Sequence, residues 1–153
     1  MKYRLTIAPG FSIFFLSAFV YLAKRYDSWD RHAMSRDHRR LRVFVLADSL
    51  VPRIYNATNT FPHFERFGLQ AQLRRAAVST ACNIVEGSAR RTTREYLNFL
   101  NIAAGSASEA RYLCDISSRL GFMPASDSDG LITAYTELSA RLQALIAALC
   151  HKP

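Results

Sequence analysis

Apolar residues return at steps of three and four along most of the chain after Met34, which is the period of an α-helix that buries one face. The first stripe predicts a helix from about Arg36 to Ala57. Its apolar positions are Val43, Ala47, Leu50 and Ile54. Pro52 lies inside this stripe and cannot donate an amide hydrogen bond to Asp48, so we expect a kink in this helix.

The next segment, TNTFPHFERFG, is typical of a connection, because Pro62 disfavours the helical state in the residue before it. A second helix is predicted from about Phe64 or Gly68 to Glu86, and Gly87 is placed to end it. The apolar stripe of this helix comprises Leu69, Leu73, Ala77, Thr80 and Ile84.

Thr92 and Glu95 form a capping-box pattern, which predicts the start of a third helix that continues to about Gly121. Its stripe comprises Tyr96, Phe99, Ala103, Ser106, Ala110, Leu113, Ser117 and Leu120. The segment FMPASDSD is predicted to be a loop before the fourth helix. The stripe of that helix comprises Leu131, Tyr135, Leu138, Leu142, Leu145 and Leu149. No segment shows the two-residue alternation of a strand.

Four amphipathic helices with short joints favour an all-α fold, an up-down-up-down antiparallel four-helix bundle in residues 34–153. In this topology the first and third helices begin, and the second and fourth end, at one pole. We call the basic residues expected there the arginine pole: Arg39, Arg40, Arg42, Arg90, Arg91 and Arg94. Arg36 and Lys152 are expected nearby, and Asp37, Glu86 and Glu95 offset only part of the charge.

Residues 1–33 are predicted to be a separate N-terminal extension. The stretch from Leu5 to Ala23 is almost entirely apolar and has basic residues on both sides, so it resembles a signal segment or a short membrane anchor. A proline and a glycine interrupt it, and no A-x-A cleavage site follows. An appended or mis-started segment, an anchor and a signal all remain open. We expect a cytoplasmic protein, with membrane association only if the extension is a retained anchor.

The whole chain carries 20 Lys+Arg against 12 Asp+Glu, a formal net charge of +8 that suits an anionic partner without defining one. Cys82, Cys114 and Cys150 lie far apart without CxxC spacing, which argues against a zinc site or a disulfide framework, and we interpret them as buried thiols. The four histidines show no metal-binding spacing. We therefore predict no catalytic residue, no metal and no cofactor, and a protein that is not an enzyme.

Two long runs carry a family resemblance. They are FPHFERFGLQAQLRRAAVSTACNIVEGSARR and REYLNFLNIAAGSASEARYLCDISSRLGF. Over most of Arg42 to Leu149 the chain resembles the four-helix bundle proteins encoded in intervening sequences of bacterial large-subunit ribosomal RNA genes. The apolar extension and Pro52 depart from the pattern of that family.

The resemblance implies a homopentamer and a suspected link to ribosomal RNA, with no established activity. It also implies kinship with the accessory protein of diversity-generating retroelements, which binds nucleic acid and a reverse transcriptase.

Two further sets of residues have a structural and a functional interpretation. Arg74 and Arg75 either belong to a solvated face or a subunit contact, or they bind phosphate. Ser79, Asn83 and Glu86 fall on one helical face, and we interpret them as polar groups that pair at a helix or subunit interface, with Glu109 as a partner. A third set, the small residues Ala76, Ala77, Ala81, Ala103, Ala104 and Gly105, allows close approach of backbones.

The leading hypothesis is an oligomeric bundle that binds RNA or other nucleic acid through the arginine pole. We expect binding to the phosphate backbone with weak sequence specificity, because no aromatic stacking platform is visible in the sequence. The alternative is a protein-interaction scaffold that docks an acidic or polymerase-like partner. Four apolar or small residues outside the stripes predict a homo-oligomer: Phe44, Val45, Ala76 and Ile102.

Overall fold

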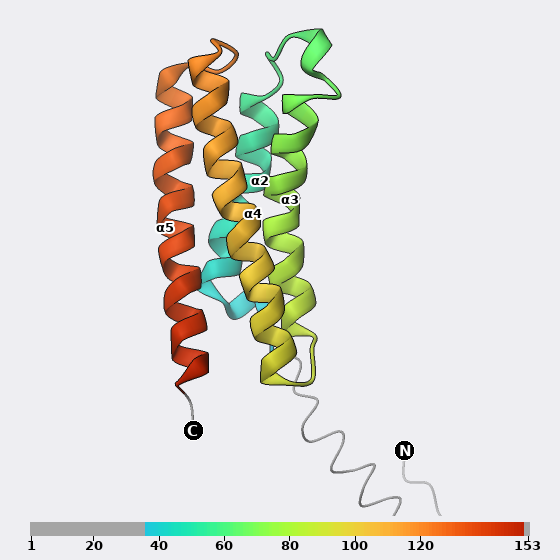
Figure 1. The fold of residues 1–153 in the computed structure, drawn as a ribbon, viewed down its shortest axis with the longest axis vertical. Coiled ribbons are helices and arrows are strands. Elements are labelled where there is room, and N and C mark those ends of the chain that lie inside the picture. Colours follow the sequence, from blue (N-terminus) through green and yellow to red (C-terminus); the bar gives the residue numbers. More distant parts are fainter. Residues whose placement is uncertain (1–35, 152–153) are drawn as a thin grey trace, which may run out of the picture. The chain divides into compact units, whose positions relative to one another are not determined.

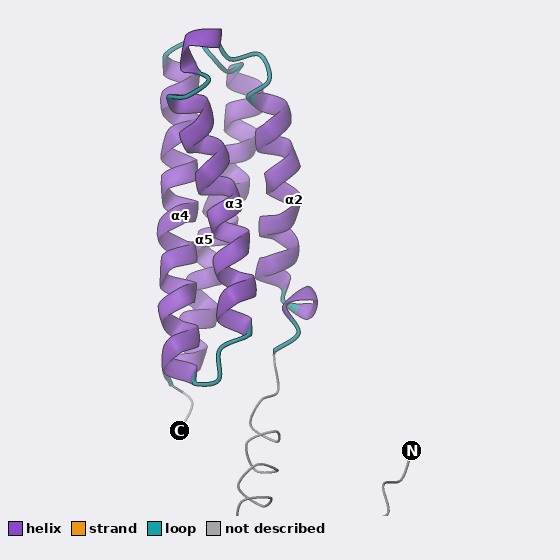
Figure 2. Ribbon diagram, turned by 90° about the vertical axis from the view of Figure 1, so that its right-hand side faces the viewer, coloured by secondary structure: helices purple, strands orange, loops and turns teal. Residues whose placement is uncertain are grey.

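The computed structural model describes residues 36–151. In chain order its elements are η1 (His38–Arg40), α2 (Arg42–Ala57), η2 (His63–Glu65), α3 (Leu69–Ser88), α4 (Thr93–Arg119) and α5 (Ala125–Cys150). Within these residues there is no strand. Figures 1 and 2 show the four long helices side by side, with the chain reversing direction at each connection. The predicted all-α, up-down-up-down bundle is confirmed.

Helix α2 begins six residues later than the sequence predicted. The Asp37 side chain accepts a 3.1 Å hydrogen bond from the Arg39 amide, and the chain closes one short 3-10 turn. Leu41 then adopts an extended conformation, with φ −82° and ψ 119°. Aspartate competes with helical backbone bonds in this way, which separates η1 from α2. The assigned helix continues through Pro52.

The core confirms most of the predicted stripes. In α2, α3 and α5 the predicted apolar positions are buried or half-buried. Helix α4 differs, because Leu120 is 54% exposed and a second row beside the predicted one is also buried. This second row comprises Leu100, Ala104, Ala107 and Cys114. Ala76 is buried as well, so the prediction that it belongs to a leftover outer surface was wrong.

Close contact between α3 and α4 explains Gly87, which was wrongly predicted to stop the second helix. Helix α3 continues to Ser88, and a Cβ atom on Gly87 would lie 2.8 Å from the Cβ of Phe99. Glycine is therefore needed here for packing. A Cβ atom added to Gly105, by contrast, would meet no heavy atom within 4 Å, so this glycine plays no part in packing within the bundle.

Gly121 ends α4 as predicted. It has a φ of 75°, the left-handed region that glycine adopts readily. Its amide donates to the Ser118 carbonyl at 2.9 Å, and the Phe122 amide donates to the Ser117 carbonyl at 2.9 Å. These two bonds form a Schellman motif.

Helix α5 begins at Ala125, directly after Pro124, so most of the predicted loop FMPASDSD is helical. The first turn contains Asp127, whose charge suits a helix N-terminus. The buried Ser128 hydroxyl donates a 3.1 Å bond to the Cys114 carbonyl of α4 and ties the two helices together.

No helix within residues 36–151 has the length and apolar character needed to cross a membrane. The predictions of an anchor, a signal or an appended segment concern residues 1–33, which lie outside the described residues.

Candidate nucleic-acid interface

Arg36 links the start of the described chain to the turn between α3 and α4. Its amide donates to the Ser88 carbonyl at 3.1 Å, and its guanidinium donates to the Arg90 carbonyl at 3.3 Å. The same guanidinium lies 4.5 Å from the centre of the Tyr96 ring. Arg36 is therefore a packing residue that holds separate segments of the chain together at this pole, as the topology predicts.

Arg90 lies in a turn but makes two contacts within the protein. It forms an ion pair with Glu86 one helical turn earlier. Its guanidinium carbon also lies 4.4 Å from the centre of the Phe99 ring, which is a cation–π contact. The residue is half-buried, so its charge is partly used within the protein.

The other five members of the arginine pole are exposed. Among residues 36–151, the guanidinium groups of Arg39, Arg40, Arg42 and Arg94 take part in no hydrogen bond or ion pair. Free guanidinium groups can form bidentate hydrogen bonds to phosphate oxygens. These four side chains therefore give the pole its available cationic surface.

The carboxylates near the pole are occupied by protein groups. Asp37 caps η1, Glu86 pairs with Arg90, and Glu95 completes the predicted capping box with Thr92. Hydrogen bonds from the Thr92 side chain and backbone lower the pKa of Glu95, with a smaller contribution from the nearby positive charge of Arg90 and Arg91. Seven arginines including Arg36 face these three carboxylates, so a positive excess remains.

The positive surface also extends along the face between α2 and α5. Arg40, Arg42 and Arg141 together line two adjoining hollows of about 370 and 320 Å³. Leu41 gives α2 no side-chain cap, and the first turn of α2 contains no acidic residue. This surface therefore combines Arg40 and Arg42 with the positive end of a helix, whereas the charge of Arg141 is paired with Glu137.

The sequence did not indicate Arg141. Helix α2 has 16 residues and α5 has 26, which correspond to lengths of about 24 and 39 Å at about 1.5 Å per residue. The start of α2 lies beside α5 well before that helix ends at Cys150, because Arg40 and Arg42 line the same hollow as Arg141. A first helix that began at Arg36 would have met the end of α5 instead. A sequence signal for the late start of α2 would have been needed to predict that Arg141 lies beside Arg40 and Arg42.

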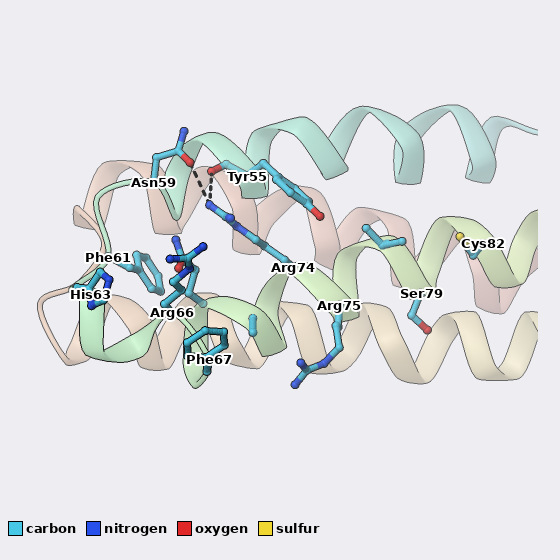
Figure 3. A pocket seen from close by; sticks show the side chains of 13 residues that line it. Tyr55, Asn59, Phe61, His63, Arg66, Phe67, Arg74, Arg75, Ser79 and Cys82 are labelled. Carbon is cyan, nitrogen blue, oxygen red and sulfur yellow. Dashed lines mark hydrogen bonds between the residues drawn. The ribbon is translucent and has the colours of Figure 1, made fainter.

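Arg74 and Arg75 lie on α3 toward the opposite end of the bundle, and they have different roles. Arg74 donates to the Thr58 hydroxyl at 2.8 Å, the Asn59 side chain at 3.0 Å and the Tyr55 carbonyl at 3.3 Å. Figure 3 shows Arg74 reaching toward α2 and Arg75 pointing the other way. Arg75 is exposed and donates to Gln72. Arg74 is therefore a link between α2 and α3.

These arginines line a groove that the sequence did not predict. The groove has a volume of about 940 Å³ and lies along the end of α2, the following connection and the first half of α3. Aromatic residues from α2 and the connection line it: Tyr55, Phe61, His63 and Phe67. No aromatic stacking platform was visible in the sequence, whereas the fold brings these residues to one groove.

The polar residues of α3 make contacts within their own helix and with α4. Asn83 donates to the Ser79 carbonyl at 2.8 Å and to its hydroxyl at 3.1 Å. The Ser79 hydroxyl in turn lies 2.9 Å from the Ser106 hydroxyl of α4. Glu86 pairs with Arg90, and Glu109 accepts a hydrogen bond from Gln72 in place of the predicted partner. Polar links between α3 and α4 therefore join Ser79 to Ser106 and Gln72 to Glu109.

The three cysteines also differ from the prediction that all are buried. Cys82 and Cys150 are exposed, and only Cys114 is buried. Burial raises the pKa of the Cys114 thiol to about 12.

Comparison with known proteins confirms the resemblance. Among solved structures, the chain is similar to the crystal structure of a protein with unknown function from the S23 ribosomal protein family, from Bacteroides thetaiotaomicron. The identity is 23%, the TM-score is 0.64, and the match covers 68% of this chain and 97% of the other. This likeness supports the fold. No curated protein matches the chain.

A family model described as 23S rRNA-intervening sequence protein matches residues 39–144. The matched range covers all of α2, α3 and α4 and most of α5, together with the whole arginine pole. The chain therefore belongs to the 23S rRNA-intervening sequence protein family.

Proposed function

We propose that the protein is a non-enzymatic, oligomeric bundle that binds RNA or other nucleic acid through the arginine pole. The observation that supports this proposal is the set of four exposed guanidinium groups without partners in residues 36–151: Arg39, Arg40, Arg42 and Arg94. The neighbouring carboxylates are already occupied, so these arginines would not be neutralised from within the protein.

The physical basis of binding is contact with phosphate. Arginines that neutralise phosphates release condensed counterions, which produces affinity that falls steeply with salt. Such contacts position a nucleic acid without reading its bases, so affinity varies little with sequence. The family name connects related proteins with 23S ribosomal RNA, which makes this RNA the first target to test and the cytoplasm the proposed location.

We also propose a homo-oligomer, with the pentamer implied by the family resemblance. Val45 of α2 is 57% exposed and Ile102 of α4 is 51% exposed, and burial between copies would remove this apolar surface from water. Assembly would multiply the arginine pole, so that one polyanion could contact several subunits. Light scattering at micromolar concentration tests this, and a monomer would contradict it.

The decisive variant of the arginine pole leaves Arg90 in place, because Arg90 packs on Phe99. We expect the triple substitution of Arg39, Arg40 and Arg94 by glutamine to weaken binding of fluorescein-labelled 23S ribosomal RNA fragments strongly. A charge-matched control replaces three arginines outside the pole by glutamine: Arg53, Arg111 and Arg119. Helix content and oligomeric state should be unchanged in both variants.

Equal RNA affinity in the two triple variants would contradict the proposal. Absence of RNA binding by the unmodified protein would favour the protein-interaction scaffold, in which the same arginines dock an acidic partner.

A further inference from the structure

The groove beside Arg74 lies well away from the arginine pole. Arg74 and Arg90 are 16 residues apart along α3 and the turn that follows it, which corresponds to about 24 Å at about 1.5 Å per residue. The groove has a volume of about 940 Å³, and its walls come from α2, the connection and α3. The proposed role of the pole does not account for it.

The groove has the charge of a site for an anion. Arg66, Arg74 and Arg75 line it, and no aspartate or glutamate does. Arg74 is fixed by its three acceptors on α2 and its connection, so one cationic group is already ordered. Arg66 and Arg75 lie further along the same groove and leave their charge open to a ligand.

Two aromatic rings in the groove remain open to solvent, although each has a guanidinium beside it. Phe67 is 85% exposed, and the Arg66 guanidinium carbon lies 5.6 Å from its ring centre. Tyr55 is 42% exposed, and the Arg74 guanidinium carbon lies 4.7 Å from its ring centre. Figure 3 shows these two ring and arginine pairs on opposite walls. An exposed ring offers a stacking face, and an adjacent guanidinium offers a contact for phosphate.

We propose that this groove binds unpaired nucleotides of a single-stranded RNA segment. Bases would stack on the Phe67 and Tyr55 rings, and the strand's phosphates would meet Arg66 and Arg75. A duplex cannot use these rings, because its bases are stacked inside the helix. The inference rests on the proposed function, and it adds that the preferred RNA has an unpaired segment within reach of the pole. An acidic peptide would satisfy the charge of the groove but would leave two stacking faces unused.

The test compares two variants, each of which removes one phenylalanine ring from an exposed position in the connection between α2 and α3. Phe67→Ala removes a groove ring, whereas Phe64→Ala removes a ring that is 76% exposed, lies 6.0 Å from the Phe122 ring and does not line the groove. Neither ring belongs to the core, so both variants should fold. The probes are a fluorescein-labelled unstructured RNA, the duplex of the same sequence, and the single strand with abasic sites.

We expect the unmodified protein to bind the single strand more tightly than the duplex or the abasic strand. Phe67→Ala should lower affinity for the single strand about tenfold, the order expected for loss of one stacked base, and leave duplex affinity unchanged. Phe64→Ala should behave like the unmodified protein. The pole variant should weaken both RNA forms, so the failure of one proposal is distinct from failure of the other. Equal loss in both phenylalanine variants, or no preference for the single strand, would overturn the groove site.

The cysteines give a second readout on the same protein. Cys82 lines the groove and is exposed, and Cys150 is exposed at the end of α5 outside the groove. Single-stranded RNA should slow alkylation of Cys82 more than the duplex of the same sequence does, whereas Cys150, at the pole end of α5, should respond alike to both RNA forms. Slow alkylation of Cys82 before RNA is added would show that another copy of the chain covers the groove. Protection by an acidic peptide but not by RNA would show a protein site, and either result would overturn the proposal.

Discussion

The Nε atom of Arg74 donates a 2.8 Å hydrogen bond to the hydroxyl of Thr58, and this bond joins α3 to the end of α2. Thr58 is fully buried and uses its hydroxyl proton to bond the Ile54 carbonyl at 2.8 Å. Replacing Arg74 by glutamine leaves this buried hydroxyl without its charged donor. We expect a loss of about 1–3 kcal/mol in the free energy of unfolding, measured by urea denaturation.

The adjacent Arg75 provides the control for this prediction. It bonds Gln72 on its own helix and has no contact with α2 among its hydrogen bonds. We expect Arg75→Gln to change the free energy of unfolding by less than about 0.5 kcal/mol, as is usual for surface substitutions. Equal stability losses in the two variants would contradict the structural role assigned to Arg74.

Gly87 and Gly105 should respond in opposite directions to substitution by alanine. At Gly87 the new Cβ would lie 2.8 Å from the Phe99 Cβ and 3.1 Å from the Tyr96 ring, so the helices must separate. Overpacking of this kind costs about 1–3 kcal/mol and outweighs the gain in helix propensity. At the open Gly105 position the propensity gain remains, so Gly105→Ala should stabilise the protein by up to about 1 kcal/mol.

Thermal unfolding of both alanine variants measures this contrast. A Gly87→Ala protein as stable as the unmodified one would show that α3 and α4 are not held at this separation.

The three thiols should differ sharply in reactivity. Burial holds the pKa of Cys114 near 12, so its reactive thiolate is scarce in the folded protein at about pH 8. We expect iodoacetamide to modify Cys82 and Cys150 in the native state and to reach Cys114 only after denaturation. Peptide mass spectrometry identifies the modified residue. Native modification of Cys114 at the rate of the other two would contradict its position in the core.

The same burial predicts a loss of stability at alkaline pH. The folded protein keeps the Cys114 proton up to about pH 12, whereas an unfolded thiol loses it near pH 9. The folded state therefore binds more protons than the unfolded state in this range, and stability falls as pH rises through it. Burial also raises the pKa of the Tyr135 hydroxyl, which acts in the same direction. Urea denaturation midpoints measured at increasing pH from about 8.5 should decline, whereas a flat profile would contradict this coupling.

The fold could be predicted from the sequence because its main determinant is periodic. Stripes such as Val43, Ala47, Leu50 and Ile54 repeat over several turns, and a bundle buries each of them. The wrong predictions concern helix boundaries that local contacts determine. Asp37 separates η1 from α2 through one side-chain bond, and Pro124 begins α5 inside an apparent loop. Alanines also lie on both sides of the apolar stripe of α4, so the edges of the stripe are not defined by the sequence. The burial of Leu100 and Cys114 was therefore not predicted.

The candidate site was only partly predictable because it depends on helix register. The topology alone brings Arg36 to the turn that contains Arg90. The approach of Arg141 to Arg40 depends on where α2 begins, which no periodicity indicates. The rings of Tyr55 and Phe67 similarly come to line one groove only when the connection folds over α3.

The salt dependence of RNA binding tests the central claim most directly. For single-stranded RNA the slope of log affinity against log salt changes by about 0.7 for each phosphate contact. We expect the triple variant of Arg39, Arg40 and Arg94 to have a slope shallower by about 2 than that of the unmodified protein. The control variant of Arg53, Arg111 and Arg119 should keep the original slope. Identical slopes for all three proteins would contradict RNA binding by the arginine pole.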